Sequence, residues 1–285
     1  MNMLYECHGH IILDGVAYRS AVARHRSGVN EAFVRGSLKI CARNGVTFYR
    51  DGGDKHMVSA FAKTVAGEYG IDYRTPVYII HKRGYYGSMF GRAFDSLSDY
   101  RALVEGVRRE GGDFIKLTAS SLLDFSNCGR VSGPEMSSAE LNEMVRIAHG
   151  EGFAVMIHAN GADNIKRSVE SGADSIEHGF YMDDDSLLMM VQAGAVWVPT
   201  CATVLNLVGV GRYDDSMLGV ILDGHKRALK KAQELGVLIA CGSDAGASFV
   251  PQGAGTVDEH YFLNSLGVDT ARGNRRIEAV FRSNF

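Results

Sequence analysis

Cysteine and proline are scarce in this chain, which has five cysteines and four prolines among 285 residues. The cysteines are scattered, odd in number and without a CxxC pair. The sequence therefore predicts no disulfide framework, and a reducing compartment is the simplest interpretation. Apolar runs of the ~20 residues that span a bilayer are missing, and so is a basic leader before an apolar stretch. We expect a soluble, cytoplasmic protein with no membrane partner.

An excess of charge of one sign is missing too. The formal net charge is −3, and acidic and basic residues are mixed along the chain, so we expect no nucleic-acid partner. What the chain has in quantity is apolar residues, 46% of the total, which suffice for a large core. No low-complexity linker or charge block marks a boundary, and we therefore expect one domain over residues 1–285.

Short apolar or β-branched segments alternate with amphipathic segments of helical period. One helix is predicted to begin after Ser137, which forms a capping-box pattern with Glu140. A second is predicted to end at Gly236. The eight candidate strands are residues 4–12, 45–51, 76–81, 114–120, 154–159, 175–179, 196–200 and 237–244. Eight such units favour an α/β fold of the (β/α)8 TIM-barrel type, with a doubly wound open sheet as the alternative.

The first candidate strand contains the tripeptide HGH, and polar residues also stand at the ends of later strands. Side chains alternate along a strand, so His8 and His10 point the same way. The polar residues at or near the ends of later strands are His81, Lys116, His158, His178 and Asp244. Each alone could be a hydrogen-bonded core residue or a helix cap. Together, at the carboxyl ends of barrel strands, they predict a site for Zn²⁺ or a related divalent ion.

Lys116 is an unexpected residue beside a metal, because a protonated amine repels a cation. A lysine whose ε-nitrogen has reacted with CO₂ becomes a carbamate, which is a carboxylate. Such a group can bridge two metal ions. A carbamate would therefore explain a lysine at this position, and N6-carboxylation of Lys116 is what the resemblance given next implies.

The motifs resemble those of the amidohydrolase superfamily, binuclear subtype, and are most similar to its branch of imidazolonepropionase-like and prolidase-like metal-dependent hydrolases. They occur in that family's order over nearly the whole chain. The matching segments are HGH at 8–10, GVTFYRDGG at 45–53, GGDFIKLTAS at 111–120, VMIHANG at 155–161, GADSIEHGF at 172–180, VPT at 198–200 and GVLIACGSDAG at 236–246.

The resemblance implies a barrel with two divalent ions, with zinc expected and manganese, nickel or iron as alternatives. The first ion would be held by His8, His10 and Asp244, the second by His158 and His178, and carboxylated Lys116 would bridge the two. A hydroxide shared by the metals would attack a carbonyl carbon. Asp244 would act as general base and then as general acid towards the leaving nitrogen.

The resemblance also implies substrate contacts after the third strand. His81 is expected to contact the substrate and to take part in catalysis, with a structural hydrogen bond as the alternative. In the following loop, Arg83, Tyr85 and Tyr86 are candidates for substrate binding, with a solvated surface loop as the alternative. Arg50 and Asp51 end the second strand, where we predict a structural ion pair.

Several functions fit these residues. The first is hydrolysis of an amide-type C–N bond in a cyclic amide, an N-acyl amino acid or a dipeptide-like compound. The alternatives are a lactone, a phosphoester or a deamination substrate at the same metals, and a non-catalytic descendant that binds a metabolite or a metal. A bridging Lys116 argues against the deaminases.

Relatives in the superfamily carry an accessory β-sandwich outside the barrel. Here the first strand begins within the first few residues, so we expect that sandwich to be largely absent. The barrel would then be stable alone or covered by a second copy in a homo-oligomer.

Overall fold

The computed structural model describes residues 3–282. Its strands are β1 (Leu4–Gly9), β2 (Val46–Asp51), β3 (Asp72–Arg74), β4 (Ile79–Lys82), β5 (Gly91–Phe94), β6 (Ile115–Thr118), β7 (Val155–Ala159), β8 (Ser175–His178), β9 (Val196–Val198) and β10 (Leu238–Ile239). Its helices are α1 (Tyr18–Ala23), α2 (Glu31–Arg43), α3 (Val58–Val65), the 3-10 helix η1 (Ala66–Tyr69), α4 (Leu97–Arg109), α5 (Ser138–Gly150), α6 (Ala162–Glu170), α7 (Asp184–Ala193), α8 (Ala202–Leu205), α9 (Asp215–Leu235), α10 (Ala254–Ser265) and α11 (Ala271–Val280).

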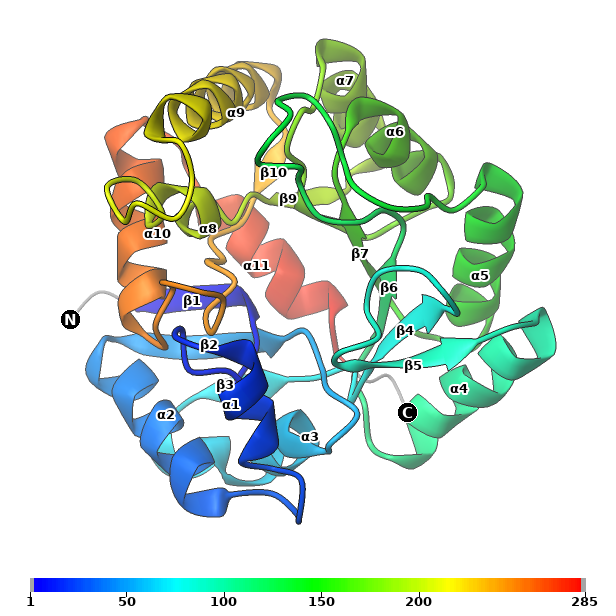
Figure 1. Cartoon of the computed structure of the whole chain (residues 1–285). Helices are drawn as coiled ribbons and strands as arrows, with labels where there is room; N and C mark the ends of the chain where they lie inside the picture. The colour runs from blue at the N-terminus through cyan, green and yellow to red at the C-terminus, as the bar shows by residue number, and fades with distance from the viewer. Residues whose placement is uncertain (1–2, 283–285) are drawn as a thin grey trace.

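The strands form a closed parallel barrel with helices outside it (Figure 1). Two parallel sheets, in the orders β1-β2-β3 and β10-β9-β8-β7-β6-β4-β5, make up the wall. They join on one side where Cys7 N donates to Cys241 O at 2.9 Å and Asp244 N donates to His8 O at 2.7 Å. On the other side Asp113 N donates to Thr75 O at 2.8 Å. All eight predicted strands are present, and the TIM-barrel prediction is confirmed over the open-sheet alternative.

The third barrel strand differs from its prediction because it is broken into β3 and β4. Pro76 lacks an N–H, and Val77 has a φ of 64°, so the ladder is interrupted between the two halves. The segment after His81, predicted as a loop, contains the short strand β5, which pairs with β4. This extra strand lies at one edge, beside the barrel mouth.

The helices cover the barrel with amphipathic faces. The Ser137–Glu140 capping box at the start of α5 is confirmed, as is the left-handed Gly236 that ends α9. Helix α9 begins at Asp215, after an Asp214 side chain that accepts a hydrogen bond from Ser216 N.

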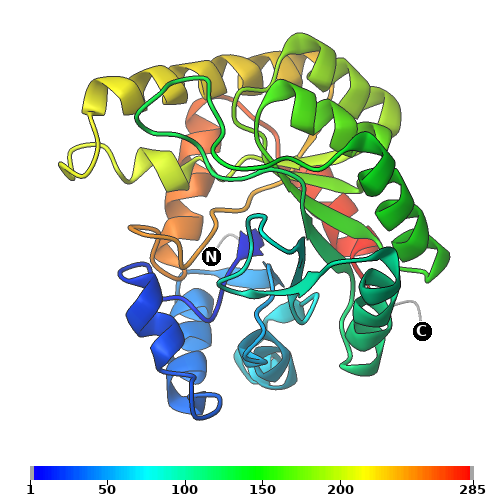
Figure 2. The same cartoon turned by 45° about the vertical axis from the view of Figure 1, so that its right-hand side comes forward.

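The amino-terminal end of the barrel is covered by α11, drawn in red behind the strands in Figure 1 and right of centre in Figure 2. Phe281, just after this helix, packs edge-on against Phe114 with ring centroids 5.2 Å apart, and Ile277 is buried in the same cluster. This end of the barrel is therefore filled by apolar side chains, and the polar strand ends lie at the other. No helix within residues 3–282 is both long and apolar enough to span a membrane.

Candidate metal and active site

The strand register brings the predicted polar residues to the barrel mouth. Along the wall, Thr118 on β6 lies opposite His158 on β7, and His158 lies opposite Glu177 on β8. Lys116, two residues before Thr118, faces the same interior as His158. Residues far apart in the sequence thus line one space because neighbouring strands are parallel and in register.

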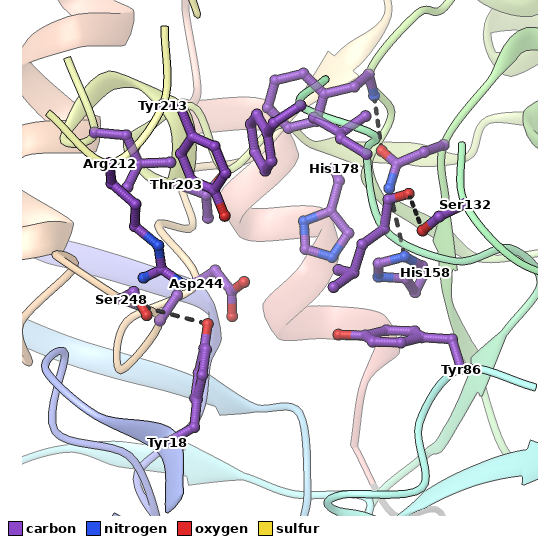
Figure 3. A pocket seen from close by; sticks show the side chains of 17 residues that line it. Tyr18, Tyr86, Ser132, His158, His178, Thr203, Arg212, Tyr213, Asp244 and Ser248 are labelled. Atoms are coloured by element: carbon purple, nitrogen blue, oxygen red, sulfur yellow. Dashed lines mark hydrogen bonds between the residues drawn. The ribbon is translucent and has the colours of Figure 1, made fainter. Parts of the chain in front are cut away.

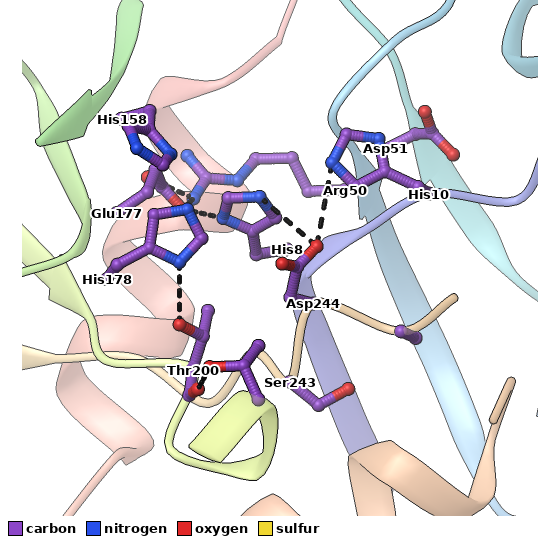
Figure 4. A network of polar contacts seen from close by, with 12 residues as sticks. His8, His10, Arg50, Asp51, His158, Glu177, His178, Thr200, Ser243 and Asp244 are labelled. Carbon is purple, nitrogen blue, oxygen red and sulfur yellow. Dashed lines mark hydrogen bonds and ion pairs between the residues drawn. The ribbon is translucent and has the colours of Figure 1, made fainter. Parts of the chain in front are cut away.

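His8, His10 and Asp244 form the tightest group. One potential ligand atom from each lies within 4.8 Å of the others. Asp244 Oδ1 is 3.8 Å from His8 Nε2 and 3.6 Å from His10 Nε2, as the dashed lines in Figure 4 show. The His10 ring has room only because residue 52 is glycine: a Cβ there would lie 2.2 Å from His10 Cε1. This explains the glycine that follows the second strand.

His158 and His178 lie beside this group. Their ring centroids are 4.4 Å apart, and the His178 ring is 4.8 Å from that of His8. His178 Nδ1 is 2.7 Å from Thr200 Oγ1. His158 Nε2 donates to Ser121 O at 3.1 Å, which leaves Nδ1 as the nitrogen with a free lone pair. All four imidazoles therefore converge on the mouth.

Burial keeps these histidines neutral, the form that binds a metal. Burial, and then repulsion from Lys116, lowers the pKa of both His10 and His158 to about 3. Burial is also the main reason why the pKa values of His8 and His178 lie well below the usual range. The four rings repel one another when protonated and do not when neutral.

Lys116 is 2% exposed, and its Nζ has no hydrogen-bond partner among residues 3–282. Burial lowers its pKa to about 8, and the nearby Arg50 adds to the effect while Glu177 and Asp244 oppose it. An amine reacts with CO₂ only when it is unprotonated, so this surrounding favours the carbamate form. The unpartnered nitrogen and the neutral histidines fit a divalent metal site.

Glu177 is one of two buried carboxylates that the sequence interpretation missed. Its Oε2 accepts from His8 Nδ1 at 2.6 Å, which directs His8 Nε2 towards Asp244. The same carboxylate accepts two hydrogen bonds from Arg50 Nη2 at 2.8 and 3.0 Å. Glu177 and Arg50 are both fully buried. One signal for Glu177 was available: an acidic side chain inside a short predicted strand, directly before the predicted ligand His178.

The predicted ion pair between Arg50 and Asp51 is wrong. Neighbouring residues of a strand point to opposite faces, so Arg50 reaches Glu177 inside the barrel while Asp51 points away. Asp51 instead accepts hydrogen bonds from Ile11 N at 2.8 Å and from the Tyr73 hydroxyl at 2.6 Å. Burial raises the pKa of Asp51 to about 7.

Asp244 sits on a backbone with a φ of 60°, and His178 and Thr200 also have positive φ. Such conformations cost about 1–3 kcal/mol each and are concentrated at functional sites. Burial raises the pKa of Asp244 to about 7, and Lys116 opposes that rise. Glu6, a second missed carboxylate, accepts from Ser243 N at 2.8 Å and so fixes the residue before Asp244.

Of the four predicted substrate contacts, one lies at the cavities of the site and three do not. Tyr86 lines both cavities described below, whereas His81, Arg83 and Tyr85 line neither. His81 lies under the following loop, 3% exposed, with Nδ1 donating to Lys82 O at 3.0 Å. The exposed Arg83 pairs with Asp95 at 2.8 Å, and Tyr85 lies under the Lys82 ammonium.

Two cavities meet at the mouth. The inner cavity, about 300 Å³, includes His8, His10 and Lys116 in its wall. The outer cavity, about 310 Å³ and drawn in Figure 3, includes Arg212 and Tyr213. Their shared lining residues are Tyr18, Tyr86, Leu122, His158, His178, Asp244 and Ala247. A small molecule that occupies both cavities therefore passes directly over Asp244 and the two histidines.

Known proteins have sequences similar to that of this chain. Ochratoxinase of Aspergillus niger is 25% identical over 281 residues, covering 85% of this chain and 57% of its own length. The uncharacterized protein Rv2915c of Mycobacterium tuberculosis is 28% identical over 166 residues, covering 56% of this chain and 44% of its own. The chain thus spans about half the length of the curated relatives that it matches.

Solved structures show the same fold. A Xaa-Pro dipeptidase with bound methionine superposes with a TM-score of 0.75 at 21% identity, over 98% of this chain and 73% of that one. The crystal structure of A. niger ochratoxinase gives a TM-score of 0.72 at 20% identity, over 98% and 70%. The model of the family described as "Amidohydrolase family" matches residues 25–278. The chain belongs to the amidohydrolase family.

Proposed function

We propose that this protein is a metal-dependent hydrolase that cleaves an amide-type C–N bond. The observation that carries the proposal is the convergence of four neutral histidines, the unpartnered Lys116 amine and the Asp244 carboxylate on one cavity wall. A cluster of this kind is expensive to bury unless a ligand satisfies it. The names of the relatives, an ochratoxinase and a dipeptidase, agree with amide hydrolysis.

The residues proposed to hold two divalent ions are His8, His10, Lys116 as its carbamate, His158, His178 and Asp244. Bound in this way, divalent ions supply Lewis-acid polarisation of a carbonyl and activation of water. Zinc suits imidazole and carboxylate ligands, and manganese, nickel and iron are the alternatives.

The chain's own groups have distinct tasks in this proposal. Glu177 orients His8 through the 2.6 Å contact with Nδ1, and Thr200 orients His178 in the same way. Asp244, whose side chain is 18% exposed, lies where both cavities meet. From there its carboxylate can accept a proton from the attacking water and return it to the leaving nitrogen.

For contacts with the substrate, only one of the predicted residues is supported by its position. Tyr86 presents its ring against His158, with centroids 4.8 Å apart, and lines both cavities. It therefore stays a candidate contact for the substrate. For His81, Arg83 and Tyr85, a role in substrate binding or catalysis remains a prediction that requires the loop after β4 to change its position.

The test is a substrate panel on metal-loaded protein, made of N-acyl amino acids, dipeptides, cyclic amides, lactones and aryl phosphates. Turnover of one or more amides supports the proposal. Turnover of lactones or phosphates alone contradicts it and favours the same metals acting on another bond. Metal binding without turnover of any class favours a non-catalytic descendant.

A further inference from the structure

A third cavity lies outside the barrel mouth, away from the candidate metal site. Its volume is about 640 Å³, and it shares no lining residue with the inner or the outer cavity. Its wall is formed by one face of α9, the segment that leads into α7 and the loop after β6. Helices α7 and α9 are neighbours on the outside of the barrel (Figure 1). The stacked rings of Phe180 and His225, with centroids 4.0 Å apart, separate this cavity from the outer one, which Phe180 lines.

Two polar atoms in the wall of this cavity are buried without a hydrogen-bond partner. They are His225 Nδ1 and Tyr181 Oη, and neither has a partner among residues 3–282. His225 is 3% exposed, and its Nε2 donates to Pro199 O at 3.1 Å, so Nδ1 keeps a free lone pair. A buried acceptor without a donor destabilises the folded chain. A ligand that brings a hydroxyl or amino donor to this wall would satisfy it.

The charged groups in the wall favour an anion. Arg227 and Lys231 both line the cavity, and Asp184 is the carboxylate in the same wall. Lys231 lies 3.5 Å from Glu234 on its own helix. Arg227 is exposed and forms no ion pair with any carboxylate among the residues that the structure describes. Two cations and one carboxylate thus face the cavity, and the guanidinium of Arg227 is available to the anion of a ligand.

Gly224 keeps space open between the buried wall and the charged wall. With 3.6 residues per turn, His225 and Arg227 lie on nearly opposite sides of α9, and Gly224 lies between them. Glycine inside a helix is destabilising relative to alanine. The packing of the chain does not require glycine here, because a Cβ at residue 224 would have one neighbour within 4 Å, Arg227 Nη2 at 3.8 Å. A larger side chain would extend into the cavity, so this glycine preserves room for a ligand.

We propose that the third cavity binds a small organic acid that carries a hydroxyl or amino group at the end opposite its carboxylate. The carboxylate pairs with Arg227, and the hydroxyl or amino group donates to His225 Nδ1. The apolar body between them packs against Met182, Ile221 and Ala228, which line the cavity. This site goes beyond the proposed function and does not depend on it, since the two share no residue.

The experiment compares three compounds by calorimetry on the purified full chain. 3-(4-Hydroxyphenyl)propionate carries both groups, 3-phenylpropionate lacks the hydroxyl, and 3-(4-hydroxyphenyl)propionamide lacks the charge. Gly224→Leu fills the cavity, and Arg227→Gln removes the partner of the carboxylate. Gly219→Leu is the matched control for the first variant, because Gly219 lies on the same helix, lines none of the three cavities and leaves an added Cβ without a neighbour within 4 Å.

We expect the wild type to bind the hydroxy acid about 10- to 100-fold more tightly than the amide, the range of a hydrogen bond to a charged group. It should bind the hydroxy acid about 3- to 10-fold more tightly than 3-phenylpropionate, the range of a neutral hydrogen bond. Gly224→Leu should abolish binding, whereas Gly219→Leu should retain it. Arg227→Gln should bind the hydroxy acid and the amide equally.

Several results would overturn the proposal. They are the absence of saturable binding of the hydroxy acid to the wild type, equal affinities of the wild type for the acid and the amide, and binding that survives in Gly224→Leu. The last result would place the compound at the barrel mouth or elsewhere on the surface. Loss of binding in both leucine variants would overturn it as well, because the effect would then come from the helix and not from the cavity. If Gly224→Leu does not fold, the exposed Arg227→Gln still decides the matter, since a preference for the acid that survives in it contradicts the site.

Discussion

Glu177 Oε2 accepts a hydrogen bond from His8 Nδ1 at 2.6 Å, while the same carboxylate pairs with Arg50. A fully buried cation in the barrel wall is thus connected through one carboxylate to a candidate metal ligand. The Glu177 carboxylate has two roles. It neutralises the charge of Arg50 inside the barrel, and it holds the His8 ring in one orientation.

Replacement of Glu177 by Gln should therefore damage both stability and metal binding. The buried guanidinium of Arg50 would lose its counter-charge, which costs about 3–5 kcal/mol of unfolding free energy. Metal affinity should fall about 10- to 100-fold because His8 loses its orienting acceptor. Urea unfolding of the metal-free protein and metal titration measure the two effects.

Ser175→Ala is the matched control for this prediction. Ser175 accepts from Arg50 Nη1 at 2.9 Å and donates to Glu177 Oε1 at 2.5 Å, so its loss removes two hydrogen bonds and leaves the ion pair. The cost should be about 2 kcal/mol with metal affinity unchanged. Equal effects of the two variants would mean that Glu177 acts through packing alone.

Asp244→Asn should lower kcat on an amide substrate by about 10²- to 10⁴-fold, the usual contribution of a general acid–base. The side-chain amide oxygen of the variant can still coordinate a cation. A folded variant that retains metal and loses turnover would therefore assign the loss to proton transfer. Elemental analysis accompanies the kinetics. Undiminished turnover in the metal-loaded variant would remove Asp244 from the mechanism.

Lys116 should carry a carbamate when metals are bound. Protein loaded with metal in ¹³C-labelled bicarbonate should give a carbamate carbon resonance that is absent from Lys116→Arg. Zinc is the suitable metal for this experiment because it is diamagnetic. Full metal content without that resonance would show that an unmodified Lys116 suffices.

His225 should make the protein less stable in acid. Burial lowers its pKa in the folded state to about 4, while the unfolded state has an ordinary pKa of about 6.5. Between these two values the unfolded chain binds more protons, so the contribution of His225 is fully present above pH ~6.5 and is lost as the pH falls towards 4. The loss is about 3 kcal/mol in total.

The site histidines add to this acid sensitivity, so the comparison is between variants. His225→Gln keeps a donor for Pro199 O, to which the wild-type ring donates at 3.1 Å. In metal-free protein its unfolding free energy should fall less steeply with acid than that of the wild type. His260→Gln on α10 should keep the wild-type slope. Equal slopes in all three proteins would contradict the prediction.

The barrel and the site histidines could be predicted from the sequence because both follow from local patterns. Hydrophobic period and turn residues mark eight strands, and strand alternation aims His8 and His10 together. The role of Glu177 could not be predicted in this way. In a regular strand the neighbours Glu177 and His178 would point to opposite faces of the sheet. Both side chains face the barrel mouth only because the backbone of His178 has a φ of 69°.

Contacts between residues that are far apart in the sequence could not be predicted either. The sequence places Arg50 next to Asp51 and suggests an ion pair between them, whereas in the folded barrel Arg50 pairs with Glu177, 127 residues away. The outer cavity has the same origin, since Tyr18, Tyr86 and Arg212 come from three separate connections. Local periodicity predicts elements and does not predict which loops meet above them.

Metal content per chain tests the central claim most directly. Protein purified without chelator, and supplied with bicarbonate and zinc or manganese, should hold about two equivalents of metal by elemental analysis. The His8→Ala/His10→Ala double variant should lose at least half of that metal, and His56→Ala should lose none. Folded wild-type protein without metal, or a double variant that binds as much as the wild type, would contradict the account.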